Sequence, residues 1–210
     1  MQTVFFDIIK DMIEVEKKFI LTGDDATRLT EGAEFQNERV FTDIYYDTAD
    51  FKLTTQDKWL RARDGQFELK MPLHHGPERM ADQYDEIESE AEIRRALELP
   101  PRGSLAADLR EAGYAPFCTC TTTRRKYKLG EFIIDLDAVD FRDFTYALGE
   151  IELMVDDKSE MQNATEKIIA FAKEKKLTFA PVRGKVMEYL KRMNQKHYQA
   201  LIAAGVVKDF

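Results

Sequence analysis

Four short segments of the chain carry acidic or basic residues at alternate positions. They are Glu14 and Glu16 with Lys18, Arg61 with Arg63, Asp135 with Asp137, and Glu150 with Glu152. Successive side chains of a β-strand point to opposite faces, so residues two apart share a face. If these strands close into a barrel with their charged faces inward, acids and bases line one polar tunnel. Such a tunnel suits a polyphosphate bound together with a metal ion.

The acidic pairs supply the oxygen ligands that a hard cation prefers. Alternating charge around Glu14 and Glu16 is also typical of an ordinary solvated sheet face. The second cluster favours a metal site, because Asp135-Leu136-Asp137 and Glu150-Ile151-Glu152 fall on predicted neighbouring strands and carry acids alone at the shared positions. Like charges that face each other across strands are destabilising, and a bound cation offsets that repulsion. Mg²⁺ commonly joins one or two carboxylates to substrate phosphates.

The bases show a complementary pattern. Arg61 and Arg63 share a face, Lys70 follows on the next predicted strand, and Arg125 lies on the strand before the acidic one. Guanidinium groups match phosphate oxygens in a two-pronged geometry, whereas lysine acts as a point charge. Each base alone is typical of a surface charge, and only the set indicates a phosphate site. Trp59 is either a core residue or a stacking surface at the tunnel mouth for an aromatic leaving group.

Composition excludes several classes of function. The 210 residues carry a net charge of −8, which argues against nucleic-acid or anionic-membrane binding through bulk electrostatics. Cys118 and Cys120 are poorly placed to bridge to each other, and no apolar run approaches the length of a membrane span. His74 and His75 have no Cys or His at zinc spacing. We expect a cytoplasmic, unprocessed monomer that binds a small molecule and neither nucleic acid nor membrane.

The residue pattern predicts an α+β fold with seven or eight strands, most of them antiparallel. We expect residues 1–11 to be an N-terminal extension and residues 12–210 to be one domain. Strands are predicted at 12–21, 40–48, 59–63, 67–71, 83–88, 117–128, 131–138 and 146–155. Helices are predicted after residue 24 or 25, at 89–97, at 104–112, from a capping box at Ser159 and Gln162 onward, at 185–193 and at 195–203. The segment from His74 to Asp82 is expected to be mostly a loop.

The ordered motifs resemble the CYTH superfamily, the triphosphate tunnel metalloenzymes, from about Met12 to Leu201. They are Glu14-Val15-Glu16-Lys17-Lys18-Phe19, Tyr45-Tyr46-Asp47-Thr48, Trp59-Leu60-Arg61-Ala62-Arg63, Phe67-Glu68-Leu69-Lys70, Asp135-Leu136-Asp137 and Gly149-Glu150-Ile151-Glu152. The resemblance implies an eight-stranded antiparallel closed barrel with surrounding and C-terminal helices. It also implies an interior that binds a triphosphate and a divalent metal.

The resemblance assigns roles to individual residues. Metal ligands would be Glu14, Glu16, Asp135, Glu150 and Glu152, with Asp137 as a ligand or a supporting group. Phosphate ligands would be Lys18, Arg61, Arg63, Lys70, Arg125 and Lys185, and Trp59 matches a position associated with a thiazole ring. Glu14 and Glu16 would hold a metal or orient the attacking water, and Lys18 is an alternative base if neighbouring cations depress its pKa.

The implied activity is hydrolysis of the terminal phosphate of a triphosphate with Mg²⁺, or with Mn²⁺ as the alternative metal. Thiamine triphosphate is the leading substrate, and inorganic tripolyphosphate and ATP are the alternatives. Some bacterial members of the superfamily make cyclic AMP instead, and a non-catalytic polyphosphate-binding module is a further alternative. The stretch at Arg142-Asp143-Phe144 and the loop around His74 depart from the mammalian pattern, which affects the expectation for the substrate.

Overall fold

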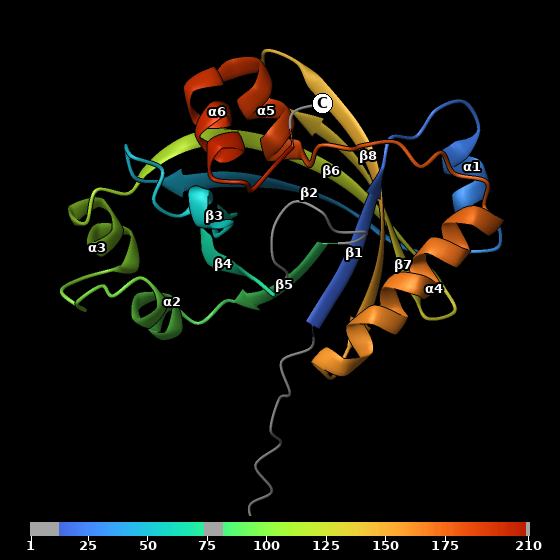
Figure 1. Ribbon diagram of the computed structural model, residues 1–210, viewed down its shortest axis with the longest axis horizontal. Coiled ribbons are helices and arrows are strands. Elements are labelled where there is room, and N and C mark those ends of the chain that lie inside the picture. Colours follow the sequence, from blue (N-terminus) through green and yellow to red (C-terminus); the bar gives the residue numbers. More distant parts are fainter. Residues whose placement is uncertain (1–12, 74–81, 209–210) are drawn as a thin grey trace, which may run out of the picture.

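The computed structural model describes residues 13–73 and 82–208. The predicted extension at 1–11 and the predicted loop at His74 and His75 lie outside these ranges. Within the described residues, eight strands form a closed antiparallel barrel in the order β1-β5-β4-β3-β2-β6-β7-β8, and β8 pairs with β1 to close it. Figure 1 shows the strands curving around a common interior, with helices outside them. The predicted eight-stranded α+β barrel is therefore confirmed.

The strand bounds follow the predicted segments closely, with one exception. The strands are β1 (Ile13–Phe19), β2 (Glu34–Asp47), β3 (Trp59–Arg63), β4 (Gln66–Pro72), β5 (Asp82–Ile87), β6 (Ala115–Leu129), β7 (Phe132–Asp140) and β8 (Thr145–Val155). Strand β2 begins six residues before the predicted start. Its first seven residues are exposed and pair along the long β6, so they lack the apolar alternation that marks a half-buried strand.

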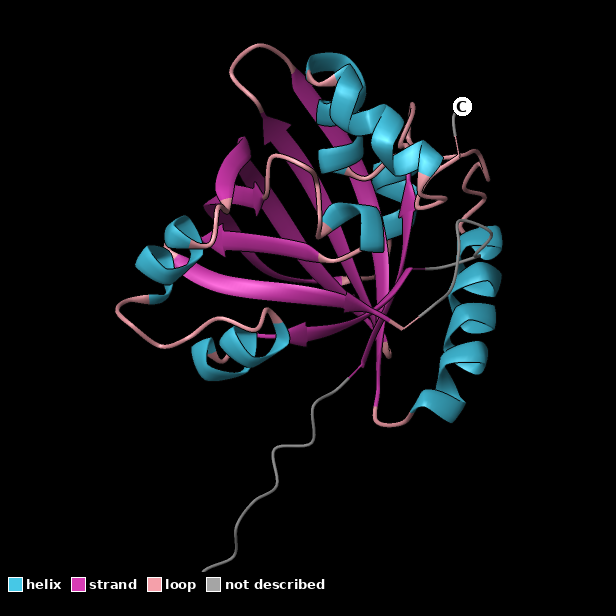
Figure 2. Cartoon of the chain, turned by 60° about the vertical axis from the view of Figure 1, so that its left-hand side comes forward, coloured by secondary structure: helices cyan, strands magenta, loops and turns pink. Residues whose placement is uncertain are grey.

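The outer face of the barrel, rather than its interior, holds one of the main apolar cores. Val15, Ile134 and Ile151 have no exposed surface and pack in one cluster with Ile168 and Phe171 of helix α4 (Met161–Glu174). Figure 2 shows α4 lying along one side of the strands. Because side chains alternate along each strand, an apolar outer face leaves the intervening positions pointing into the barrel. Those positions carry the charged residues.

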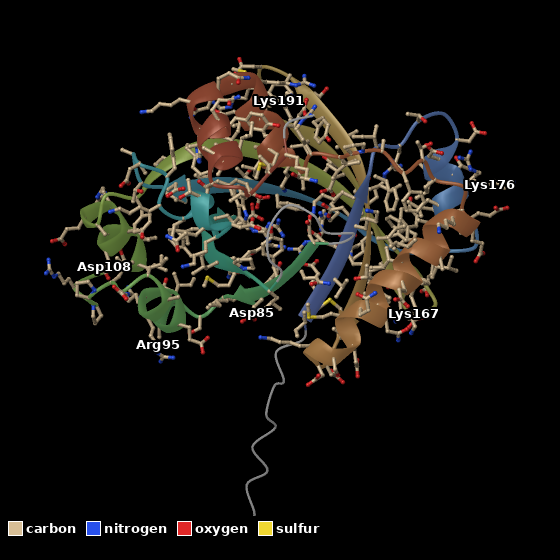
Figure 3. All side chains as sticks on the ribbon, in the orientation of Figure 1. Asp85, Arg95, Asp108, Lys167, Lys176 and Lys191 are labelled. Atoms are coloured by element: carbon tan, nitrogen blue, oxygen red, sulfur yellow. The ribbon has the colours of Figure 1, made fainter. Side chains whose placement is uncertain are left out.

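Five further α-helices pack around the described barrel. They are α1 (Asp25–Thr30), α2 (Glu90–Ala96), α3 (Leu105–Glu111), α5 (Lys185–Met193) and α6 (Gln195–Ala203). Helices α2 and α3 pack on the side of β3 and β4, and α5 and α6 pack against residues of β2, β6 and β8. Charged residues such as Arg95 on α2 and Lys167 on α4 lie on the outside of the molecule (Figure 3).

The predicted capping box at the start of α4 is wrong. A short 3-10 helix, η2 (Lys158–Glu160), precedes α4, and the backbone N–H of Ser159 donates to Asp157. The side-chain amide of Gln162 donates to Glu166 further along the helix, not back to the cap. Asp157 therefore caps η2, the short helix that precedes α4. At α3, the Ser104 hydroxyl accepts from the backbone N–H of Ala107 and caps the helix.

Among the described residues, no helix combines the length and the apolar character needed to cross a membrane.

A buried histidine joins the last helix to the rim of the barrel. His197 on α6 is fully buried, and its Nε2 lies 2.6 Å from the hydroxyl oxygen of Thr54. That hydroxyl donates its proton to Asp47 at 2.7 Å, so it can only accept a hydrogen bond from His197. The hydrogen of the neutral imidazole ring therefore sits on Nε2. The other ring nitrogen, Nδ1, has no hydrogen-bond partner among the described residues. Burial lowers the pKa of His197 to about 4, against the opposing effect of Asp47.

We predict that His197 makes stability depend on pH between its folded and unfolded pKa values. The unfolded chain takes up the proton near pH 6.5 and the folded chain does not, so stability is complete above that value and falls as the pH drops toward 4. Between pH 7.5 and 5.5 the loss from this residue should be about 1.4 kcal/mol. Urea unfolding of the wild type and His197→Gln at both pH values measures it. Equal pH dependence in the two proteins would contradict the prediction.

Candidate active site

The barrel interior encloses a cavity of about 490 Å³. Its walls are the inward side chains of the strands, together with the segment before α5 and residues near the end of the chain. Cavity-lining residues that carry charge include Glu14, Glu16, Lys18, Arg61, Arg63, Lys70, Asp82, Glu86, Arg124, Glu150, Glu152, Arg183 and Lys185. Acids and bases from several strands therefore do converge on one cavity.

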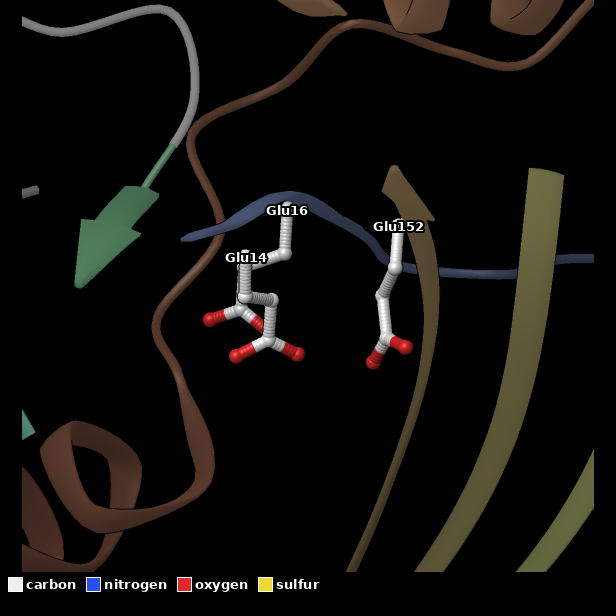
Figure 4. Close-up of side chains that lie close together, drawn as sticks. All are labelled: Glu14, Glu16 and Glu152. Carbon is white, nitrogen blue, oxygen red and sulfur yellow. The ribbon is translucent and has the colours of Figure 1, made fainter. Parts of the chain in front are cut away.

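Strand register brings the predicted acids together. Glu16 on β1 lies opposite Glu152 on β8, and Asp135 on β7 lies opposite Glu150 on the other side of β8. Two carboxylate triplets result: Glu14, Glu16 and Glu152, and Asp135, Glu150 and Glu152. In each triplet every carboxylate offers one oxygen, and these oxygens lie within 4.8 Å of one another. Figure 4 shows the first triplet, with two side chains from β1 facing one from β8. Glu152 belongs to both triplets.

Burial and mutual repulsion disfavour full ionisation of these acids. Burial raises the pKa of Glu152 well above its usual range, and the carboxylates of Glu14 and Asp135 raise it further. Burial also raises the pKa of Glu16 to about 7, and Lys18 only partly opposes the shift. The pKa of Glu150 moves the other way, because Arg124 and Lys18 outweigh the effect of burial. The cluster is thus short of positive charge around Glu16 and Glu152.

The acidic cluster fits a hard divalent cation. Asp135 is fully buried, with its Oδ2 2.5 Å from Arg124 Nη1 and 3.0 Å from Lys126 Nζ. Its other oxygen, Oδ1, has no hydrogen-bond partner among the described residues. Buried carboxylate oxygens that lack such partners are suited to a metal ion. An all-oxygen donor set matches Mg²⁺ or Mn²⁺ rather than zinc or copper.

Asp137 has a different position from the other predicted acids. Its two oxygens accept hydrogen bonds from Nε and Nη2 of Arg124 at 2.6 and 2.7 Å. It belongs to neither carboxylate triplet. Asp137 therefore orients Arg124, and its predicted role as a metal ligand or a supporting group stays a prediction.

Most of the predicted phosphate ligands line the cavity, and most are paired with a carboxylate. Arg61 Nη2 lies 2.5 Å from Glu68, and Lys70 Nζ lies 3.1 Å from Glu14 and also contacts Glu86. Burial disfavours the charge on Lys70, but Glu14, Glu16 and Glu86 outweigh it and raise its pKa. The bases therefore remain charged inside the barrel.

The assignment of Arg125 to the cavity is wrong, and Arg124 takes its place. Arg125 is exposed and lies opposite Glu38 on β2 and Leu136 on β7. Arg124 points inward, where it contacts Asp135, Asp137 and Glu150. The run Arg124-Arg125-Lys126 places a base on each face of strand β6. Only the pairing of β6 with β7, which sets Arg124 opposite Asp137, decides which base faces inward.

The surroundings of Lys18 argue against its alternative role as a base. Its Nζ contacts Glu16 and lies 2.8 Å from Asp82 and 4.0 Å from Glu150. Burial disfavours its charge, but these carboxylates outweigh burial and raise its pKa well above the usual range. Lys18 is therefore a fixed positive charge beside the acids.

Several site residues were missed by the sequence analysis. Asp43 is fully buried, and its oxygens accept from Arg63 at 2.9 and 3.2 Å and from Lys185 at 2.5 Å. Its position two residues from Phe41 and from Tyr45 on a predicted strand is the signal that could have found it. Other missed charges in or beside the cavity include Asp57, Glu68, Asp82, Glu86, Arg124, Lys126 and Arg183.

An aromatic ring packs against the bases that contact Asp43. The side chain of Phe41 is buried, with the guanidinium carbon of Arg63 4.1 Å and Lys185 Nζ 5.3 Å from its ring centroid. The guanidinium carbon of Arg124 lies 5.8 Å away. Cations over a ring face are attracted by its quadrupole, so Phe41 helps to hold three bases in one region of the wall.

Comparison with known proteins agrees with this geometry. The family model described as the CYTH domain matches residues 12–178. The thiamine-triphosphatases of Homo sapiens and Macaca fascicularis are each 31% identical to this chain over 94% of its length and 93% of theirs. Among solved structures, the PH1819 protein of Pyrococcus horikoshii OT3 has a similar fold, with a TM-score of 0.61 at 23% identity. That match covers 85% of this chain and 99% of the archaeal one. Barrel, cavity and sequence lead to the same result: the chain belongs to the CYTH domain family.

Proposed function

We propose that this protein is a divalent-metal-dependent hydrolase that converts thiamine triphosphate to thiamine diphosphate and orthophosphate. The observation that carries the proposal is the convergence of two carboxylate triplets and a set of charged bases on one cavity. The thiamine-triphosphatases that resemble the chain over 94% of its length support the choice of substrate. Each proposed role below rests on where the side chain lies in that cavity.

The bases would bind and orient the polyphosphate. Arg61 and Arg63 share one wall, and the guanidinium forks can each engage two phosphate oxygens. Asp43 holds Arg63 and Lys185 in place before substrate arrives. Positioning of this kind supplies much of the catalysis in phosphoryl transfer, together with stabilisation of the transition-state charge.

The acids would hold Mg²⁺ and orient the attacking water. Glu152 stands between the two triplets, with Glu14 and Glu16 on one side and Asp135 and Glu150 on the other. Bound Mg²⁺ supplies charge neutralisation and a Lewis acid for the phosphate oxygens. Glu16, whose carboxylate borders the cavity, would orient a water in line with the terminal phosphoryl group.

The bases that line the cavity would bind a triphosphate irrespective of the group attached to it. Inorganic tripolyphosphate and ATP are therefore the second candidate substrates, supported by the same bases. A cyclase would release pyrophosphate from ATP, and a binding module without turnover would release nothing. Product analysis separates these functions.

The first prediction from this proposal concerns turnover. With saturating Mg²⁺ the protein should release orthophosphate, fastest from thiamine triphosphate in a panel with tripolyphosphate and ATP at equal concentration. Excess chelator should abolish the release, and Glu16→Gln should lower kcat by about 100-fold or more. The exposed Glu174→Gln on α4 is the matched control and should leave kcat unchanged. Near wild-type activity of Glu16→Gln, or phosphate release in chelator, would refute the proposed mechanism.

Two adjacent arginines give a second prediction, because they point to opposite faces of β6. Arg124→Gln should lower kcat/KM by about 100-fold or more, since it removes the base beside Asp135, Asp137 and Glu150. Arg125→Gln removes the same charge from the outer face and should leave kcat/KM within about twofold. Arg124→Lys keeps the charge without the fork and should fall between them. Thermal unfolding of all three identifies a variant that fails to fold, and equal kinetics for the two Gln variants would contradict the assignment.

Metal binding should also stabilise the fold without any substrate. At free Mg²⁺ ten times its dissociation constant, stabilisation should be about 1.4 kcal/mol, which corresponds to about 3–6 °C in Tm for a chain of this size. Glu152→Gln removes the carboxylate shared by both triplets, so the Mg²⁺-induced shift should shrink. Differential scanning fluorimetry with Mg²⁺ and with chelator measures the shift. A full shift in Glu152→Gln would show that the metal binds elsewhere.

A further inference from the structure

Part of the cavity wall comes from the segment between α4 and α5 rather than from a strand. Residues 180–184 line the cavity, and Arg183 is the charged residue among them. Strand β8 anchors this segment, because the hydroxyl of Tyr146 donates to the carbonyl oxygen of Arg183 at 2.7 Å. Lys185, which also lines the cavity, follows two residues later. The backbone of Arg183 is therefore fixed beside a phosphate-binding base.

The buried carboxylate of Glu188 on α5 holds the Arg183 side chain. Nε of Arg183 donates to Oε2 of Glu188 at 2.6 Å. Only 6% of the Glu188 side chain is exposed, compared with 23% of the Arg183 side chain. Burial disfavours the charge on Glu188, but hydrogen bonds from Arg183 and Arg192 outweigh burial and lower its pKa. Glu188 is therefore a fixed anion, and Arg183 is its partner on the cavity side.

This pairing repeats the arrangement of the arginines on the strands. Each of them donates from Nε to one carboxylate, in the pairs Arg61 with Glu68, Arg63 with Asp43 and Arg124 with Asp137. These three arginines line the cavity, as Arg183 does. A guanidinium group has five N–H donors in a fixed plane, so a carboxylate at Nε orients the group without using all of its donors. Arg183 therefore shares the geometry of the arginines that we propose as phosphate ligands.

The other oxygen of Glu188 connects this pair with the turn between β7 and β8. Nε of Arg192 donates to Oε1 of Glu188 at 2.6 Å, and the guanidinium carbon of Arg192 lies 4.5 Å from the centroid of the Phe144 ring. Phe144 stacks on Phe141, which stacks in turn on Tyr189 of α5. Phe144 belongs to the stretch that departs from the mammalian pattern. The turn thus supports Glu188 from the side opposite Arg183.

We propose that Arg183 is a further phosphate-binding residue and that Glu188 is the positioning residue that presents it. Arg192 and Phe144 would support Glu188 from the other side. A guanidinium group engages two phosphate oxygens at once and keeps its charge. Because Arg61 lies on β3 and Arg183 lies before α5, two separate parts of the chain would hold the polyphosphate. This inference rests on the proposed function and adds a ligand to its phosphate site.

Binding of inorganic tripolyphosphate tests the role of Arg183 without turnover. In excess chelator, Arg183→Ala should raise the Kd measured by isothermal titration calorimetry by about tenfold. Arg183→Lys keeps the charge without the fork, so its Kd should rise by about threefold. Arg110→Ala on α3 removes an exposed arginine as the matched control and should leave Kd within about twofold of the wild type. Absence of binding by the wild type, or an unchanged Kd in Arg183→Ala, would overturn the inference.

A double-mutant cycle tests the positioning role of Glu188. Glu188→Ala should raise the same Kd by about fivefold in the wild type, but by less than about twofold when Arg183→Ala is already present. A merely structural effect of Glu188→Ala would be equal in the two backgrounds and would contradict the positioning role. Thermal unfolding identifies a variant that fails to fold. Glu188→Gln keeps one acceptor oxygen and repeats the cycle with a smaller perturbation.

Turnover of two substrates identifies the part of the substrate that Arg183 contacts. In Arg183→Ala, KM should rise by the same factor, within about twofold, for thiamine triphosphate and for tripolyphosphate, because both carry the same phosphates. An increase confined to thiamine triphosphate would place Arg183 beside the organic group and would refute the phosphate contact. If the wild type hydrolyses neither substrate, the proposed function fails, and the calorimetry still decides the role of Arg183.

Discussion

Repulsion among carboxylates inside a closed barrel is the constraint on which the rest of this structure depends. Glu14, Glu16 and Glu152 approach one another because β1 and β8 pair along the seam of the barrel, and Asp135 and Glu150 add to the cluster from the neighbouring strand pair. Water cannot screen them well there, so bases must be brought in from other strands. Arg124 and Lys18 meet that need, and each contacts at least two of these acids, while Lys70 contacts Glu14. Much of the apolar material that would normally fill a small barrel lies outside it, between the strands and helix α4, and a second apolar cluster lines part of the cavity.

An interior of this kind is organised for binding rather than for maximal stability. Replacing buried ion pairs with apolar residues is often neutral or stabilising in proteins, whereas removing one partner is costly. The charged lining would therefore make its contribution on entry of the proposed polyanion and cation. Because Asp43 and Asp137 already orient Arg63, Lys185 and Arg124, little reorganisation is needed at that moment. In enzymes that transfer phosphoryl groups, fixed dipoles and charges of this type position the substrate and stabilise the charge of the transition state.

Alternation along the strands made most of this site predictable from sequence, because a strand has only two faces and one of them was plainly apolar. The same reasoning failed where both faces offered a base: Arg124 and Arg125 can be told apart only by the register between β6 and β7, which a single sequence does not contain. Asp43 was overlooked since it stands alone among aromatic and β-branched residues rather than in an acidic pair. The start of β2 was missed because its exposed residues follow no apolar period, and its pairing with β6 is a long-range property. Asp57 accepts hydrogen bonds from Trp59 on β3 and Tyr84 on β5, and the second contact spans 27 positions, so it could not be inferred from spacing.

Closure of the barrel by its first and last strands has a consequence for biosynthesis. Both carboxylate triplets include Glu152 on β8, while one of them also needs two residues of β1, more than 130 positions earlier in the chain. Lys185, which contacts Asp43, comes later still. Contacts of such sequence separation form late and slowly. Neither triplet can therefore form on the ribosome before β8 has been synthesised, and Lys185 can join Asp43 only after that.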